Sequence, residues 1–548
     1  MNKNEKKRDS FTENTIWLTI GSVFSRIIGA LYVIPWAGWF GETYTTANTL
    51  LSVGYKPYVL FTAIATAGFP SAIAKQIAFH NSKKDYETAD AIYKNSSLLM
   101  LLMGIFFSIL LYIMAPGLAY QSPSSNPEGA IKVIRSLAPA VLVLPNMSLL
   151  RGYFQGQDDM KPTAISQLLE QLIRVVYMLI ATYIIMVKQD GDVVIAVVHS
   201  TFAAFIGALI SLIYLLILYL WRKRKINACE NKINTIKNKK QEKSKLLLSI
   251  KLLFQDSIPF VIIGSGIAIF QLIDTYSFGQ IMRLTTNAST FEISELYGAF
   301  SLDVDKLTMI IISLAVSVAS AAIPSIVTSY ATQNRLLTGN LIIKVMSLFL
   351  CIMIPASIGL ASVSDYMYKF FYPTGHISGP DLLRTASIVS IVLGVYTVLS
   401  SVLQSMSFHS YAIKSLLIGL LVKILTQFPL VAFFHAQGAL VSSALGFFIS
   451  SFMMWKKINY ELNIDINILK ENILKIILSS IIMGISCWQW TRVFNLIFIE
   501  QGRLYLLCKL TIIVLIGVSV YFSMLILLGG MNIIFSEGKQ ERQNGKDK

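Results

Sequence analysis

The chain has 548 residues, of which 54% are hydrophobic and only 14% are charged. This composition excludes an ordinary soluble domain, because too few polar residues remain to cover a water-facing surface. The formal net charge of +16 would also suit a nucleic-acid-binding protein, but the basic residues lie in short segments between apolar runs, where they set membrane topology. We therefore expect a membrane protein that binds no nucleic acid.

Apolar runs of about twenty residues recur along the chain, and a helix needs about that length to cross the hydrocarbon core of a bilayer. The predicted fold class is all-α, with about fourteen transmembrane helices. Their predicted ranges are 14–38, 49–74, 95–119, 131–150, 163–187, 193–221, 252–276, 299–326, 339–364, 382–406, 412–434, 436–455, 472–494 and 504–528. We interpret the first range as a membrane anchor and not as a cleaved signal peptide, because a long polytopic array follows it.

Lysine and arginine are distributed unequally between the two sets of loops. With the N-terminus in the cytoplasm, about thirty basic residues fall on the cytoplasmic side and about four on the opposite side. This asymmetry follows the positive-inside rule and favours an even number of crossings. We predict a multi-pass protein of the plasma membrane with both termini in the cytoplasm.

The longest polar break divides the predicted helices into groups of six and eight. We predict an N-lobe at residues 1–221, a basic and flexible cytoplasmic linker at 222–251, and a C-lobe at 252–456. The remaining residues, 457–548, contain two extra helices and a cytoplasmic tail. The basic linker is also positioned to meet the anionic headgroups of membrane lipids.

A weak internal repeat relates the two six-helix lobes. An offset of 249 residues aligns four polar pairs without a gap: Arg135 with Arg384, Gln155 with Gln404, Ser166 with Ser415, and Arg174 with Lys423. Further along, Ser200 matches Ser443 at an offset of 243, which requires a small deletion. Parallel repeats of this kind are typical of transporters, in which two related bundles enclose the substrate path.

The sequence contains no motif for the chemistry of a known enzyme class. It has no GxxxxGK[ST] phosphate loop, no HExxH zinc motif, no GxSxG nucleophile elbow and no CxxC pair. We therefore expect a transporter that is not an enzyme, with no catalytic residues, no metal site and no cofactor. A membrane potential or an ion gradient is the expected source of energy.

Three basic residues lie near the middle of predicted helices, where a charge costs on the order of 2.5 to 3.5 kcal/mol and indicates function. They are Arg26, Arg174 and Lys423. Glu170 precedes Arg174 by one helical turn, so these two side chains are candidates for an ion pair. At Arg174 the sequence leaves two interpretations open, a structural ion pair and a contact with substrate.

Other charged residues lie closer to the ends of predicted helices. Lys56 and the pair Asp305 and Lys306 lie within about two turns of the outer ends, where lysine can also extend its ammonium to the membrane surface. Lys509 and three other lysines lie within about one turn of a helix end. We expect the Lys509 ammonium to extend to the membrane surface. The surplus of positive charge in the helices favours an anionic substrate such as a pyrophosphate.

One segment carries a family resemblance: Arg151 to Val175 reads RGYFQGQDDMKPTAISQLLEQLIRV. It resembles the junction between the fourth and fifth membrane helices of bacterial polysaccharide-precursor exporters of the MurJ/SpoVB type, in the MOP exporter superfamily. The resemblance extends over essentially the whole chain, including FSRIIG at residues 24–29 and a Pro-Ser pair near the end of the eighth predicted helix.

The resemblance implies a monomeric bacterial flippase that carries lipid II, the undecaprenyl-pyrophosphate-linked peptidoglycan precursor, to the outer leaflet by alternating access. It implies two six-helix lobes around a cationic cavity, and a groove for the polyprenyl tail at the last two helices. By motif, Arg26 matches a basic residue of the first helix, and Asp305 with Lys306 stands where Asp-Arg is common. The family's second basic residue of that first helix is missing here.

Taken together, Arg26 and Lys306 are the leading candidates for contact with the pyrophosphate. The further candidates are Asp305, Lys56, Arg174, Glu170 and Lys423. The alternatives left open are an exporter of another polyprenyl-linked glycan, for capsule, teichoic acid or a sporulation wall, and a multidrug cation antiporter. The antiporter is disfavoured because it needs buried carboxylates, of which the helix centres hold only Glu170. A scaffold or a membrane glycosyltransferase is a minor alternative.

Overall fold

We describe a computed structural model of the chain. It describes residues 24–25, 28–29, 31–66, 68–82, 86–157, 159–230, 239–320, 323–497 and 502–530. Arg26, the leading site candidate in the first predicted helix, lies outside these residues. The chain divides into two compact units, Met1–Gly298 and Ala299–Lys548, which are described separately.

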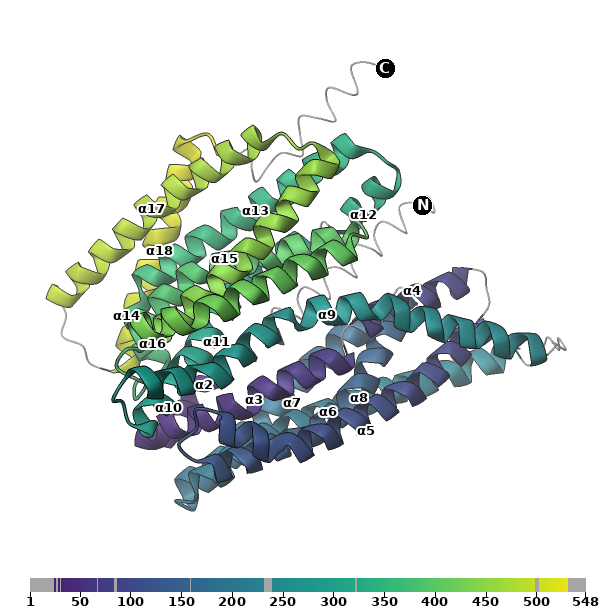
Figure 1. Cartoon of the computed structure of the whole chain (residues 1–548), viewed down its shortest axis with the longest axis horizontal. Coiled ribbons are helices and arrows are strands. Elements are labelled where there is room, and N and C mark those ends of the chain that lie inside the picture. The colour runs from purple at the N-terminus through teal and green to yellow at the C-terminus, as the bar shows by residue number, and fades with distance from the viewer. Residues whose placement is uncertain are drawn as a thin grey trace. The chain divides into compact units, whose positions relative to one another are not determined.

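The first unit is helical throughout its described residues (Figure 1). Its elements are α2 (Val33–Phe40), the short 3-10 helix η1 (Gly41–Thr43), α3 (Tyr44–Thr66), α4 (Phe69–Ser82), α5 (Tyr86–Gln121), α6 (Pro127–Gly156), α7 (Lys161–Thr182), the π-helix η2 (Tyr183–Lys188), α8 (Val193–Glu230), α9 (Lys239–Thr285) and α10 (Thr290–Gly298).

Helix α6 forms the centre of this unit and packs against α3, α4, α5 and α8. It begins sharply because Asn126 accepts a 2.9 Å hydrogen bond from the backbone N–H of Gly129, and Pro127 occupies the first helical turn, where no N–H partner is needed. By contrast, α5 presents many apolar side chains outward, including Leu102, Phe106 and Ile113. Such exposure is expected where lipid, and not water, surrounds a helix.

The predicted lobe boundary at residues 222–251 differs from the division of the structure. Helix α8 continues to Glu230 and α9 already begins at Lys239, so most of the predicted flexible linker is helical. Lysine, arginine, glutamate and glutamine dominate these segments, and all four residue types favour helix. Helix α9 packs against α3, α4 and α5, which extends the first unit to Gly298.

The second unit is also helical in its described residues. Its elements are the π-helix η3 (Ala299–Asp303), α11 (Val304–Ser320), α12 (Ile323–Ala331), α13 (Arg335–Ser362), α14 (Ser364–Phe371), α15 (Gly379–Ser405), α16 (His409–Leu462), α17 (Ile466–Ile497) and α18 (Arg503–Leu527).

Helix α16 is a hairpin of two helices that meet at His435. A straight helix of 54 residues would be about 81 Å long, far more than a bilayer requires. The backbone of His435 has φ 52° and ψ −128°, which reverses the chain between the two halves. This break falls between the predicted helices 412–434 and 436–455. Gly438 lies where the halves cross most closely, since a Cβ there would be 1.9 Å from the carbonyl oxygen of Leu430.

The last two helices, α17 and α18, pack against each other and on α13. Asn472 of α17 donates a 3.0 Å hydrogen bond to the hydroxyl of Ser347 in α13. From α18, the Tyr521 hydroxyl donates a 2.9 Å hydrogen bond to the carbonyl oxygen of Cys351 in the same helix α13. The pair is thus attached to the second unit by buried polar contacts as well as by apolar packing.

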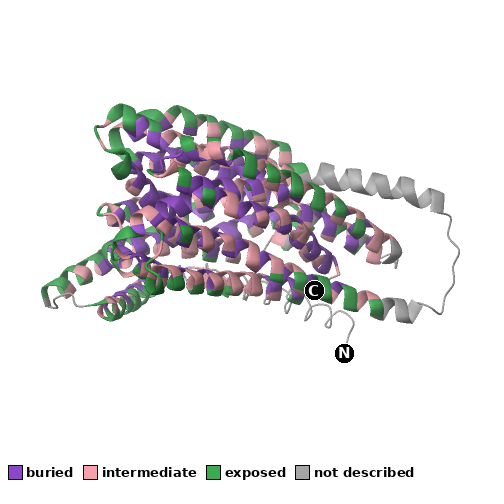
Figure 2. Cartoon of the chain, turned by 90° about the horizontal axis from the view of Figure 1, so that it is seen from below, coloured by how far each residue is buried: buried purple, intermediate pink, exposed green. Residues whose placement is uncertain are grey.

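Within the described residues, nine helices are long and apolar enough to cross a membrane. Helix α16 is one of these nine although it contains two halves, so the exact number of fourteen crossings stays a prediction. Exposed positions follow the outward sides of the helices and buried positions lie within the bundles (Figure 2). The chain is therefore an all-helical multi-pass membrane protein.

The two units repeat one helix–helix contact, in agreement with the predicted offset of 249. In the first unit, the Ser211 hydroxyl of α8 donates a 2.8 Å hydrogen bond to the carbonyl oxygen of Ser166 in α7. In the second, the Ser450 hydroxyl donates a 2.9 Å hydrogen bond to the carbonyl oxygen of Ser415 across the α16 hairpin. This contact pairs the second helices at an offset of 239, whereas the predicted match of Ser200 with Ser443 has an offset of 243.

Candidate functional site

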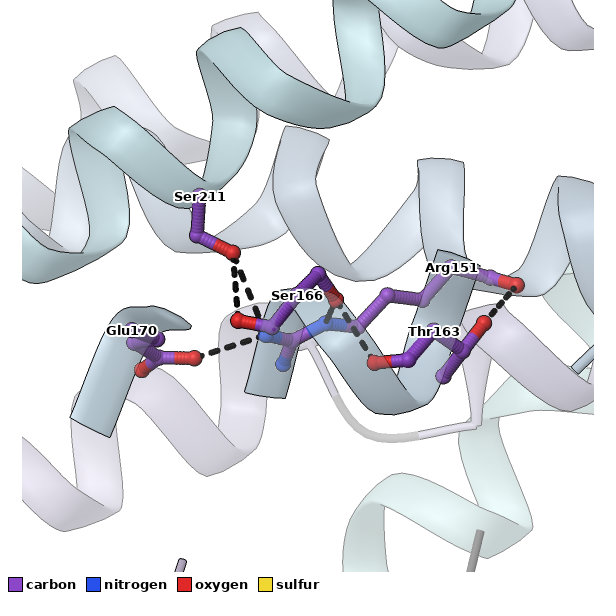
Figure 3. A network of polar contacts seen from close by, with 5 residues as sticks. All are labelled: Arg151, Thr163, Ser166, Glu170 and Ser211. Carbon is purple, nitrogen blue, oxygen red and sulfur yellow. Dashed lines mark hydrogen bonds and ion pairs between the residues drawn. The ribbon is translucent and has the colours of Figure 1, made fainter. Parts of the chain in front are cut away.

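A polar network joins α6, α7 and α8 in the first unit (Figure 3). At its centre, the guanidinium of Arg151 donates a 2.8 Å hydrogen bond from Nε to the Ser166 hydroxyl and forms a 2.8 Å ion pair from Nη2 to Glu170 Oε2. The Thr163 hydroxyl donates to the carbonyl oxygen of Arg151 at 3.2 Å, and Nη2 also lies 3.5 Å from the Ser211 hydroxyl. One arginine thus connects three helices through charge and hydrogen bonds.

The ion pair of Glu170 differs from the predicted one. The sequence suggested Arg174, one turn later on the same helix, but the carboxylate binds Arg151 of the preceding helix. The physical reason is the short connection between α6 and α7, which makes the two helices antiparallel neighbours and brings Arg151 opposite the first turns of α7. Both side chains are mostly buried, with 14% and 26% of their surfaces exposed.

Arg174 faces an aromatic side chain of α3. Its guanidinium carbon lies 5.3 Å from the centre of the Tyr55 ring, and Nη1 donates a long 3.4 Å hydrogen bond to the Tyr55 hydroxyl. The next residue of α3, Lys56, is buried with 5% of its surface exposed. The first unit therefore holds two of the predicted cationic residues on α3 and α7, at depths where charge is costly.

Lys423 is held inside the α16 hairpin. Its ammonium donates hydrogen bonds to the carbonyl oxygen of Ala439 at 3.1 Å, to the Ser442 hydroxyl at 2.9 Å and to the Ser443 hydroxyl at 2.7 Å. Each of these oxygens is an acceptor for a donor hydrogen of the ammonium. The side chain is completely buried, so the geometry gives Lys423 a structural role in joining the two halves of α16.

The predicted pair in the second unit lies at the start of α11. Asp305 stands in the first turn of the helix, where a carboxylate is favoured by the helix dipole, and Lys306 is half-buried beside it. The buried Asp303 just before them was not predicted from the sequence. Its carboxylate accepts a 2.7 Å hydrogen bond from the Tyr368 hydroxyl, and its carbonyl oxygen accepts one of 3.1 Å from Tyr372.

Lys509 was expected to extend to the membrane surface, and this prediction is wrong. Only 2% of its surface is exposed, and its ammonium lies 5.4 Å from the ring centre of Tyr366 and 4.7 Å from that of Tyr505. Helix α14 packs against α18 and covers the lysine. Position relative to a helix end could not reveal this, because the covering ring comes from a helix more than a hundred residues earlier.

The predicted site residues fall in both units. Lys56, Arg174 and Glu170 share the first unit, whereas Asp305, Lys306 and Lys423 belong to the second. Arg151 and Tyr55 were missed as partners of the predicted residues. A signal for Arg151 existed, since Glu170 is a deep carboxylate that needs a cation and Arg151 directly follows the predicted helix 131–150.

Residues 11–330 match the model of the family described as "Polysaccharide biosynthesis protein". Among curated proteins, the lipid II flippase MurJ of Bacillus subtilis (strain 168) is 34% identical over 521 residues, which cover 92% of this chain and 93% of that protein.

Two solved structures show the same fold. The lipid II flippase MurJ in an inward closed conformation matches with a TM-score of 0.63 and 16% identity, over 94% of this chain and 99% of the other. An inward-facing multidrug resistance MATE family transporter of the MOP superfamily matches with a TM-score of 0.59 and 14% identity, over 81% of this chain and 98% of the other. The predicted fold class is thereby confirmed.

Proposed function

Because this chain belongs to the polysaccharide biosynthesis protein family, we propose that it is a flippase that moves lipid II from the inner to the outer leaflet of the bacterial plasma membrane. The observation that carries the proposal is the 34% identity with the Bacillus subtilis lipid II flippase over nearly the whole length of both chains. Identity of that extent favours a shared substrate, whereas the MATE likeness concerns the fold alone.

The charges of the described helices support an anionic substrate. A pyrophosphate needs hydrogen-bond donors and positive charge, which arginine supplies as a planar fork and lysine as a point charge. Arg174 and Lys56 offer these groups in the first unit, and Lys306 offers one in the second. We assign the pyrophosphate to Arg26 and Lys306 first, with Arg174 and Lys56 as further contacts.

The apolar surface of the last two helices supports a place for the polyprenyl tail. Both helices expose apolar side chains, among them Ile481 and Ile485 of α17 and Leu515 and Phe522 of α18. A tail of hydrocarbon would bury this surface without the loss of any polar contact. We propose that the tail lies against α17 and α18 while the headgroup crosses.

The charge of the substrate also suggests an energy source. Moving two negative charges outward across an inside-negative membrane is favourable by about 4.6 kcal/mol per 100 mV, from about 2.3 kcal/mol per charge. We propose that the membrane potential drives the net outward movement. If transport in vesicles is unchanged after the potential is collapsed with an ionophore, this source of energy is excluded.

The direct test is reconstitution of the purified chain in liposomes with fluorescent lipid II. The fraction of label in the outer leaflet is followed by its access to a membrane-impermeant quencher, with protein-free liposomes as the control. We expect exchange well above the control for lipid II. Faster exchange for another polyprenyl-linked glycan would assign the chain to that substrate, and export of a cationic dye without lipid II exchange would indicate an antiporter.

Orientation can be tested in cells. From the distribution of basic residues, we propose that both termini lie in the cytoplasm. A reporter that fluoresces only in the cytoplasm, fused after Lys548, should therefore be bright. A dark reporter together with a full-length fusion protein would reverse the proposed topology.

A further inference from the structure

Arg174 uses few of its hydrogen-bond donors. A guanidinium has five N–H groups, and in the described part of the chain only one of them forms a hydrogen bond, the long one to Tyr55. The side chain is half-buried, and the ring of Tyr55 stabilises its charge without occupying the remaining N–H groups. Arg174 therefore keeps both the charge and the donors that a phosphate group requires.

Glu170 is the natural competitor for those donors. It lies four residues before Arg174 on α7, and residues at this spacing are neighbours on one face of a helix. A carboxylate paired with Arg174 would neutralise the charge and occupy the planar fork. A half-buried carboxylate without another cation would be expected to adopt this pairing, because an unpaired charge in a medium of low dielectric is costly.

Arg151 prevents this competition in the observed geometry. It binds Glu170 at 2.8 Å, and the two additional contacts with the Ser166 and Ser211 hydroxyls fix the direction of its guanidinium. These contacts come from α7 and α8, so the arginine is attached to the helix that carries Arg174 and to the helix that packs against it at Gly207. The carboxylate is therefore directed to α6.

We propose that Arg151 is a positioning residue for substrate binding, which holds Glu170 away from Arg174 and so keeps the Arg174 guanidinium available to the pyrophosphate of the transported lipid. This inference rests on the proposed function, since it requires an anionic lipid headgroup as the substrate. Under this proposal, Arg151 raises the affinity for substrate indirectly: it binds Glu170, and Arg174 then contacts the substrate.

The proposal predicts a specific pattern of rescue. In Arg151→Ala, Glu170 loses its partner and turns to Arg174, so the lipid II density that gives half-maximal exchange should rise about tenfold or more, the loss expected for hydrogen bonds to a charged group. In the double variant Arg151→Ala/Glu170→Gln, no carboxylate competes, and half-saturation should return to within about twofold of the wild type. In Arg174→Ala, half-saturation should rise, and adding the double substitution should not restore it.

The experiment measures exchange rate against lipid II density for each full-length variant in liposomes. Arg222→Ala is the matched control, because Arg222 forms an ion pair with Asp159 in the same unit, and its loss should leave half-saturation unchanged. Melting temperatures in detergent show whether each variant is folded. If Arg151→Ala does not fold, Arg151→Lys keeps the charge that Glu170 needs and should remain within about threefold of the wild type.

The outcomes separate the inference from the proposed function. A double variant that is as impaired as Arg151→Ala would show that Arg151 serves only to join helices, and would overturn the inference while lipid II exchange by the wild type stands. Normal half-saturation in Arg174→Ala would overturn the inference as well, because Arg174 would then make no contact with the pyrophosphate. A wild-type chain that exchanges no lipid II would overturn both.

Discussion

The close crossing at Gly438 gives the most quantitative prediction. A Cβ at this position would lie 1.9 Å from the carbonyl oxygen of Leu430, 2.3 Å from its carbonyl carbon and 2.8 Å from the backbone nitrogen of Val431. Carbon and oxygen atoms that are not bonded approach to about 3.3 Å at the closest. Gly438→Ala would therefore push the two halves of α16 apart by roughly 1.4 Å, the difference between these two distances.

All three obstructing atoms belong to the backbone, so no side-chain rotation can relieve the clash. Overpacking in a well-packed interior costs about 1 to 3 kcal/mol where side chains can move, and we expect this case to reach about 3 kcal/mol or more. The same movement would stretch the three hydrogen bonds of Lys423, which cross the hairpin next to this point. The cost is therefore concentrated in α16.

Thermal unfolding of the purified chain in detergent is the appropriate assay, with Gly359→Ala as the control. A Cβ at Gly359 would lie 3.6 Å from the terminal carbon of Met483, an ordinary contact, and alanine favours a helix by about 0.5 to 1 kcal/mol over glycine. We expect Gly359→Ala to melt at or slightly above the wild-type temperature and Gly438→Ala to melt several degrees below it. Equal melting temperatures for Gly438→Ala and the wild type would refute the close crossing.

Three further predictions concern single side chains. Tyr55→Phe keeps the ring beneath Arg174 and should change lipid II half-saturation by less than about threefold. Tyr55→Ala removes the ring and should raise half-saturation more. Equal effects of the two substitutions would contradict a role for the ring. Lys423→Met should lower the free energy of unfolding by about 1 to 3 kcal/mol, and with it the melting temperature, without changing the lipid II half-saturation. The reverse pattern would make Lys423 a substrate contact. Outside the membrane-spanning segments, the backbone N–H of Ser289, and secondarily its hydroxyl, hold the pKa of Glu292 below its ordinary value. Because the folded-state pKa is lowered, the stabilisation of α10 is present above the unfolded-state pKa and is lost as pH falls through the folded-state value. The hydrogen-exchange protection of residues 290–298, corrected for the intrinsic exchange rate at each pH, should therefore fall at acidic pH, and Glu292→Gln should remove that dependence.

The positions of the helices could be predicted largely from the sequence because lipid imposes a simple rule on them. An apolar run of sufficient length must satisfy its backbone hydrogen bonds internally, which makes it a helix. Even the reversal at His435 could be located, because the polar residues around it interrupt the apolar pattern between 412–434 and 436–455. The helical extension of α8 and α9 into the basic segment was missed, because charge and length were interpreted as flexibility although the residue types favour helix.

The partners of the charged residues could not be predicted in the same way. Sequence spacing shows which residues share a face of one helix, and this suggested that Glu170 binds Arg174. The actual partner, Arg151, comes from a neighbouring helix, and its position depends on how α6 and α7 cross. For the same reason Lys509 could not be recognised as buried, since Tyr366 belongs to α14.

The repeated helix pair explains why equivalent cations have different environments in the two units. Arg174 and Lys423 occupy equivalent positions at the offset of 249. Lys423 meets the Ser442 and Ser443 hydroxyls, whereas the equivalent positions of α8, at the offset of 239, hold two alanines without hydrogen-bond acceptors. Arg174 therefore meets no serine hydroxyl at these two positions, and its hydrogen bond goes to Tyr55 of α3. The difference at two small residues thus accompanies a structural contact for Lys423 in one unit and the proposed substrate contact for Arg174 in the other.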